Sequence, residues 1–69
     1  MLTEEESTET RATLDELQLE HRDLDLVIDH LLLNPPPDEL LVRRLKKRKL
    51  LLKDRIMQLE SALEPNAHA

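Results

Sequence analysis

Hydrophobic residues recur along this chain at alternating steps of three and four residues, in two separate stretches. The first stretch runs from position 14 to 31 and the second from position 42 to 63. This spacing keeps a stripe of apolar side chains on one face of a helix, and it is typical of the a and d positions of a coiled coil. The pattern therefore predicts two helices, each with a narrow face that packs against a partner helix.

Pro35-Pro36-Pro37 separates the two stretches. Proline cannot continue a helix, and it pushes the preceding residue toward extended geometry. We therefore expect the first helix to end near Leu33 and the second to begin near Pro37, since proline is acceptable at a first helical position. Pro65 ends the second helix. The predicted hairpin covers residues 12–63, with helices near 12–33 and 37–63 and a turn at Pro35–Pro37.

The start of the first helix has two candidates, because Thr3 and Thr13 are each followed three residues later by a glutamate, as in a capping box. The apolar repeat begins only at Leu14. The sequence therefore favours a flexible acidic segment over residues 1–11, and we expect a flexible tail over residues 64–69.

A connection this short makes the helices antiparallel neighbours, so the predicted fold class is an all-α, coiled-coil-like αα-hairpin. If facing residue numbers sum to 73, every a position faces a d position. The predicted seam then has the layers Leu31 with Val42, Ile28 with Leu45, Leu24 with Lys49, His21 with Leu52, Leu17 with Ile56, and Leu14 with Leu59. The same register predicts ion pairs between Glu20 and Arg55 and between Asp25 and Lys46.

Charge supports this pairing of the two halves. Residues 1–34 carry 10 acidic and 2 basic groups, a net charge of −8, whereas residues 35–69 carry 5 acidic and 8 basic groups, a net charge of +3. Each exposed ion pair contributes about 0.2–1 kcal/mol. We therefore expect charge to select the register and apolar burial to supply most of the stability.

Composition narrows the class of protein. Leucine accounts for 17 of the 69 residues, and the chain has no Gly, Cys, Phe, Trp or Tyr, which nearly excludes a β-rich fold. So short a chain leaves little interior for an enclosed active site, and without cysteine it has no disulfide or thiolate metal site. We therefore expect a non-catalytic protein with no cofactor.

The acidic N-terminus and the lack of a long apolar run favour a cytoplasmic protein with no membrane span.

Several short segments resemble the YdcH-like family of small bacterial proteins. They are Pro36-Pro37-Asp38, the run Leu45-Lys46-Lys47-Arg48-Lys49-Leu50, and the run Leu52-Lys53-Asp54-Arg55-Ile56. The upstream segment Glu20-His21-Arg22-Asp23-Leu24-Asp25, with Ile28 and Asp29, is similar to that family's first helix. The resemblance covers roughly residues 14–63. It implies a coiled-coil-forming hairpin of bacterial origin and uncharacterised function, and it supplies no catalytic residues.

Two polar residues, His21 and Lys49, interrupt the seam in adjacent predicted layers. One interpretation is a catalytic or metal site, but no nucleophile lies nearby, and His21 with Asp25 gives too few ligands for a structural zinc site. The interpretation we favour is structural. Each apolar stem lies in the seam and each polar end reaches outward, His21 toward Asp25 or Glu20 and Lys49 toward the acidic flank of the first helix.

Leucines outside the seam point to association. Leu19, Leu26 and Leu33 recur every seven residues nearly opposite the seam of the first helix, and Leu50, Leu51 and Met57 form a patch on the outer side of the second. A lone hairpin would leave both surfaces in water. We therefore expect a homo-oligomer, with hairpins assembling into a helical bundle, that acts as an adaptor and binds a protein partner of unknown identity.

The alternative function is that of a small RNA- or ribosome-associated factor. Six of the seven residues from 43 to 49 are basic, and of these Arg43, Arg44 and Lys47 face outward on the helix. The net charge of −5 and the absence of aromatic residues that could stack on bases make nucleic acid the less favoured partner.

Overall fold

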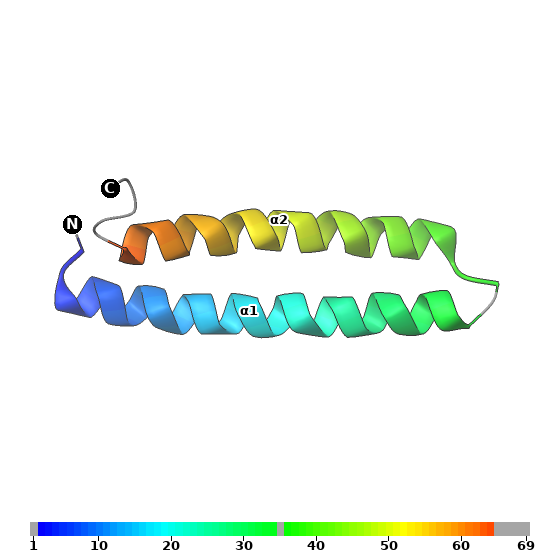
Figure 1. The fold of residues 1–69 in the computed structure, drawn as a ribbon, viewed down its shortest axis with the longest axis horizontal. Coiled ribbons are helices and arrows are strands. Elements are labelled where there is room, and N and C mark those ends of the chain that lie inside the picture. The colour runs from blue at the N-terminus through cyan, green and yellow to red at the C-terminus, as the bar shows by residue number, and fades with distance from the viewer. Residues whose placement is uncertain (1, 35, 65–69) are drawn as a thin grey trace.

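The computed structural model describes residues 2–34 and 36–64, and these form two helices joined by a short turn. Helix α1 is Glu4–Leu33 and helix α2 is Glu39–Leu63. The helices lie side by side and antiparallel, with the turn at one end and the start of α1 and the end of α2 at the other (Figure 1). The all-α antiparallel hairpin predicted from the apolar spacing is therefore confirmed.

The start of α1 differs from the prediction. The helix begins at Glu4, so most of the segment 1–11 that was expected to be flexible is helical. The cause is a complete capping box. The backbone N–H of Glu6 donates to Oγ1 of Thr3 at 3.1 Å, and the N–H of Thr3 donates to Oε1 of Glu6 at 3.1 Å. Three glutamates in the first turn also face the positive end of the helix dipole.

The second candidate cap is not used. The hydroxyl of Thr13 instead donates to the backbone carbonyl of Glu9, at 3.1 Å, as it does in the interior of a helix. Two half-buried residues, Ser7 and Thr10, extend the seam spacing from Leu14 toward the N-terminus. The predicted register places Thr10 opposite Leu63, which is also half-buried. The seam therefore extends beyond its first leucine toward the N-terminus. The end of the seam away from the turn is lined by small hydroxyl side chains.

The turn end also differs slightly from the prediction. Helix α1 ends at Leu33, and the side-chain amide of Asn34 donates to the carbonyl of His30 at 2.6 Å. Helix α2 begins at Glu39 and not at Pro37, because Asp38 serves as its N-cap and accepts a hydrogen bond of 3.0 Å from the N–H of Leu41. Pro35 and the predicted tail beyond Glu64 lie outside the described residues.

The core between the helices is thin. Within residues 2–34 and 36–64, the buried hydrophobic side chains are Leu24, Ile28, Val42 and Ile56, and none of them is completely buried. All four occupy predicted seam positions. The other eight predicted seam residues are half-buried: Leu14, Leu17, His21, Leu31, Leu45, Lys49, Leu52 and Leu59. A pair of helices buries only one stripe of each, so much of the apolar surface stays in water.

No helix in the described part of the chain has an apolar stretch long enough to span a bilayer.

Candidate functional site

The two polar residues of the seam converge on one carboxylate. Nζ of Lys49, on α2, contacts Oδ1 of Asp25, on α1. Nδ1 of His21 lies 3.8 Å from the other carboxylate oxygen, Oδ2, and this distance is too long for a hydrogen bond. The hydrogen bond from Lys49 lowers the pKa of the Asp25 carboxyl, and the charge of Lys49 and of His21 when protonated acts in the same direction. His21 and Lys49 thus both direct their polar ends out of the seam toward the acidic flank of α1.

A second ion pair joins the helices on the other side of the seam. Nε and Nη2 of Arg48 both donate to Oε1 of Glu20, and the Nε contact is 3.0 Å long. The predicted partners of the two acids were Arg55 for Glu20 and Lys46 for Asp25, so both predicted ion pairs are wrong for the described structure. Lys49 lies about one turn from Lys46, and Arg48 lies about two turns from Arg55. Seam spacing specifies which seam residues face each other, whereas the conformation of the long side chains decides which ion pairs form.

At the centre of the hairpin, Asp25 lies near both His21 and Lys49. His21 and Asp25 form an ion pair within α1, but Nδ1 of His21 and Oδ2 of Asp25 are too far apart to share a proton directly. Among the described residues, no group of three or more His, Asp or Glu side chains could hold a metal ion. The arrangement of Lys49, Asp25 and His21 is one that satisfies polar groups at the edge of a narrow core.

The outward hydrophobic residues form the most distinctive surface. Leu26 lies two residues from both Leu24 and Ile28, which are buried, so it is nearly opposite the seam. We call Leu19, Leu26 and Leu33 the α1 outer stripe, and Leu50, Leu51 and Met57 the α2 outer patch. All six side chains are between 57% and 79% exposed. A hairpin of this size thus leaves large apolar side chains in water on both of its outer sides.

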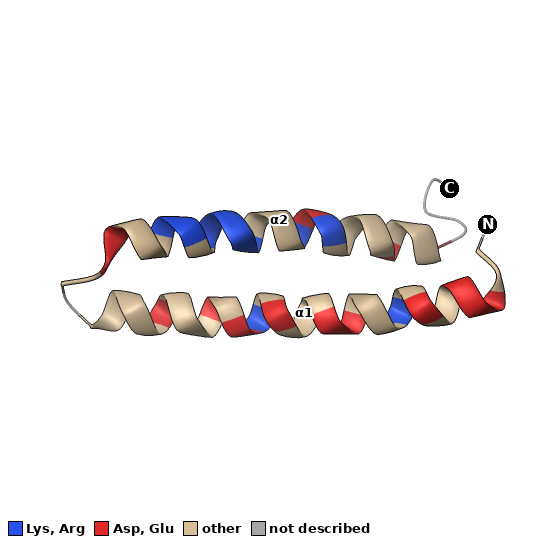
Figure 2. Cartoon of the chain, turned by 180° about the vertical axis from the view of Figure 1, so that it is seen from behind, with Lys and Arg blue, Asp and Glu red and all other residues tan. Residues whose placement is uncertain are grey.

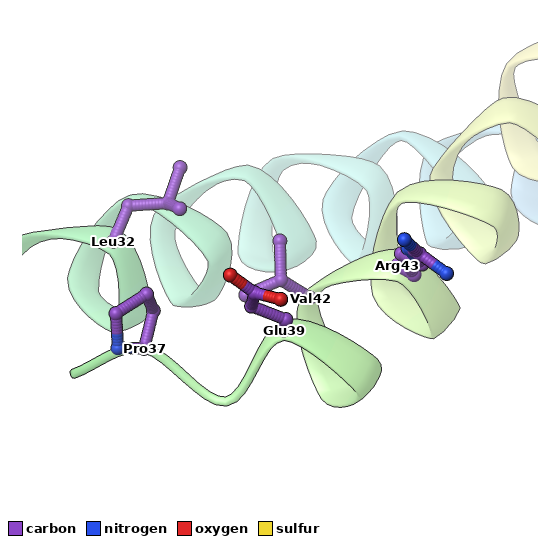
Figure 3. Close-up of a pocket in the computed structure, with 5 residues that line it drawn as sticks. All are labelled: Leu32, Pro37, Glu39, Val42 and Arg43. Atoms are coloured by element: carbon purple, nitrogen blue, oxygen red, sulfur yellow. The ribbon is translucent and has the colours of Figure 1, made fainter. Parts of the chain in front are cut away.

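Further exposed hydrophobic residues lie in the parts of α1 and α2 nearer the turn, and the seam spacing does not single them out. They are Val27, Leu32, Leu40 and Leu41. Beside them is a shallow hollow lined by Leu32, Pro37, Glu39, Val42 and Arg43 (Figure 3). The signal was available in the runs Leu31-Leu32-Leu33 and Leu40-Leu41-Val42, because three consecutive residues of a helix cannot all face one seam.

The basic residues are concentrated in the half of α2 nearer the turn, whereas acidic residues recur along α1 (Figure 2). Lys49 and Arg48 contact α1, as described above. Arg43, Arg44 and Lys47 are exposed, and within the described residues none of them forms a salt bridge. These three residues add positive charge to the outer side of α2.

Residues 14–60 match the family described as "Protein of unknown function (DUF465)". The match covers more than half of the chain, so the chain belongs to this family. The family includes the YdcH-like small bacterial proteins, and the resemblance noted in the sequence is thereby confirmed. No curated protein and no solved structure matches the chain. The matched region begins at the first seam leucine and ends just beyond the last predicted layer.

Proposed function

We propose that this protein is a non-catalytic helical interaction module that self-associates and binds a protein partner through its outer leucines. The observation that carries the proposal is the exposure of the α1 outer stripe and the α2 outer patch. Scattered exposed leucines are ordinary on soluble proteins, but aligned ones on both sides of a small hairpin favour burial against another chain. The bacterial cytoplasm is the setting we propose, in keeping with the family's bacterial members.

The thin core supports the same proposal. Small domains without disulfides or metals seldom obtain enough stability from one narrow core. Pairing hairpins into a larger helical bundle adds apolar burial at about 25 cal/mol per Å². A fully exposed leucine that becomes buried in this way contributes about 1.5–3 kcal/mol. Self-association would thus strengthen the fold and cover the exposed side chains together.

The test is the double variant Leu26→Glu with Leu50→Glu, studied by sedimentation velocity. Both positions are more than half exposed in the single hairpin, so the substitutions leave its core intact. We expect the variant to sediment as a single 8.1 kDa chain at concentrations where the wild type is larger. The matched control is Gln18→Glu with Gln58→Glu, which adds the same charge at exposed polar positions of the same two helices. An unchanged mass for the leucine variant would count against the proposal.

The second candidate function is RNA or ribosome association through Arg43, Arg44 and Lys47. The observation that favours it is that all three bases are exposed and unpaired within the described residues. Phosphate contacts of this kind weaken steeply as salt rises. Titration of the chain with mixed-sequence RNA at low salt tests this candidate. A variant with glutamine in place of all three bases should bind the RNA more weakly. Absence of binding at low salt would exclude it.

A further inference from the structure

We propose that self-association is heterologous: the α1 outer stripe of one copy packs on the α2 outer patch of a second copy. This inference rests on the self-association proposed above and adds which surfaces meet. The molecule that covers each outer surface is therefore a second copy of this chain. Two observations carry this inference, namely the position and the charge of the two surfaces.

The two surfaces lie on opposite sides of the hairpin. The α1 outer stripe is nearly opposite the seam of α1, since its leucines fall midway between seam positions. On α2, Lys47 falls midway between Leu45 and Lys49, so it marks the corresponding outer side. Leu50 and Leu51 follow one turn after it and are 66% and 61% exposed. One chain therefore cannot bring its own two outer surfaces together, and a second copy is needed to cover either.

The charges around the two surfaces are opposite. Exposed acidic residues flank the α1 outer stripe three or four positions from its leucines: Asp15, Glu16, Asp23 and Asp29. One exposed arginine, Arg22, lies among them. At the same spacing from the α2 outer patch, exposed bases outnumber exposed acids: Lys46, Lys47, Lys53 and Arg55 against Asp54 and Glu60. Towards the turn, the patch continues into the exposed bases Arg43 and Arg44. Within the described residues, none of these groups forms a salt bridge, so their charge remains available to a partner.

This distribution decides between the ways in which two copies can meet. A symmetric contact of α1 with α1 brings two acidic flanks together, and a symmetric contact of α2 with α2 brings two basic clusters together. Like charges across an interface are unfavourable, whereas complementary charges favour the pairing and set its register. Over the whole helices the contrast is the same, since α1 has 10 acidic and 2 basic residues and α2 has 3 acidic and 8 basic residues.

The α1 outer stripe, from Leu19 to Leu33, spans fourteen residue steps, which is about 21 Å along a helix axis at 1.5 Å per residue. The α2 outer patch, from Leu50 to Met57, spans seven steps, and it reaches fourteen only together with the exposed bases from Arg43 onward. A heterologous contact leaves one free surface of each kind on the assembled pair. We therefore expect wild-type assemblies to grow beyond the dimer as concentration rises, or to close into a ring.

The experiment mixes two variants that each lack one surface. Leu26→Glu blocks the α1 outer stripe, and Leu50→Glu blocks the α2 outer patch. Each variant alone has only one usable surface and is expected to sediment as an 8.1 kDa monomer. In an equimolar mixture the intact stripe of one variant meets the intact patch of the other. The expected product is a dimer of twice the chain mass that does not grow further, and raised salt should weaken it.

The other outcomes are each decisive. If the wild type is a monomer at every concentration, the proposed self-association itself fails. If the wild type associates but the mixture stays monomeric, or if either single variant still dimerises alone, the contact is symmetric or elsewhere and the heterologous arrangement is wrong. Far-UV circular dichroism of each variant checks that it is helical, and Leu26→Gln with Leu50→Gln replace any glutamate variant that does not fold.

Discussion

The ammonium group of Lys49 on α2 contacts the carboxylate of Asp25 on α1, and this contact takes the charge of a seam lysine to the edge of the core. Lys49 is half-buried, and its side chain interrupts an otherwise aliphatic stripe. Polar residues at such positions set register and oligomer size at some cost in stability. Lys49 and His21 are therefore expected to trade stability for a defined alignment of the helices.

Replacing the seam histidine tests this role. We expect His21→Leu to raise the thermal midpoint, because a leucine buries more apolar surface in the same layer. A gain of roughly 1 kcal/mol corresponds to about 4–8 °C for a domain of this size. Thermal melts followed by circular dichroism measure the shift, and sedimentation detects any change in oligomer size. The control is Lys46→Leu, which places a leucine at an exposed position. A lower thermal midpoint for His21→Leu would show that the imidazole ring of His21 has a specific structural partner.

Acid should weaken the hairpin through Asp25. The hydrogen bond from Lys49 holds the pKa of Asp25 below its ordinary value in the folded chain. A carboxyl with a lowered folded pKa contributes stability that is present above its unfolded pKa of about 3.9 and is lost as pH falls through the folded value. We therefore expect the thermal midpoint to decrease as the pH drops below about 4. The variant Asp25→Asn should lose part of this pH dependence. Melts of both proteins across the acid range measure it. If the thermal midpoints of the wild type and of Asp25→Asn decrease identically in acid, Asp25 does not stabilise the fold.

The capping box should control the first turns of α1. The backbone hydrogen bond from Thr3 lowers the pKa of Glu6, so the box is also expected to weaken in acid as Glu6 becomes protonated. Thr3→Ala removes the N-cap, which typically costs about 0.5–2 kcal/mol of helix stability. Amide hydrogen exchange of residues 4–11 should become faster in this variant. Thr8→Ala, within the helix, is the control, and equal exchange in the two variants would argue against the box.

The hairpin itself was predictable because leucine spacing and a triple proline both point to it. The start of α1 was only partly predictable, because the sequence offers caps at both Thr3 and Thr13. Ser7 and Thr10 continue the seam with polar residues that no hydrophobic pattern reveals, so the apolar spacing favoured the later start. The ion-pair partners were also missed. Seam register places Asp25 close to both Lys46 and Lys49, and only the side-chain conformation selects Lys49. The outer leucines could be identified from their spacing. The exposed hydrophobic residues near the turn also had a signal in the sequence, because two runs of three consecutive apolar residues cannot all face one seam.

The register of the seam is open to a direct chemical test, because the chain contains no cysteine. Cysteines at Leu17 and Ile56 fall in one predicted layer and should be joined within a single chain by a short thiol-reactive crosslinker in dilute solution. Cysteines at Leu17 and Leu45 are the control, since they are separated by eleven residues in this register, about 16 Å along the helices. Efficient crosslinking of the control pair would mean that the helices are aligned differently.

Sedimentation equilibrium of the unmodified chain over a wide range of concentrations measures whether the exposed leucines serve association. The average mass should exceed the 8.1 kDa of one chain and rise with concentration, because each added copy covers an outer surface and leaves another exposed. A mass that stays at 8.1 kDa throughout would contradict self-association through these surfaces.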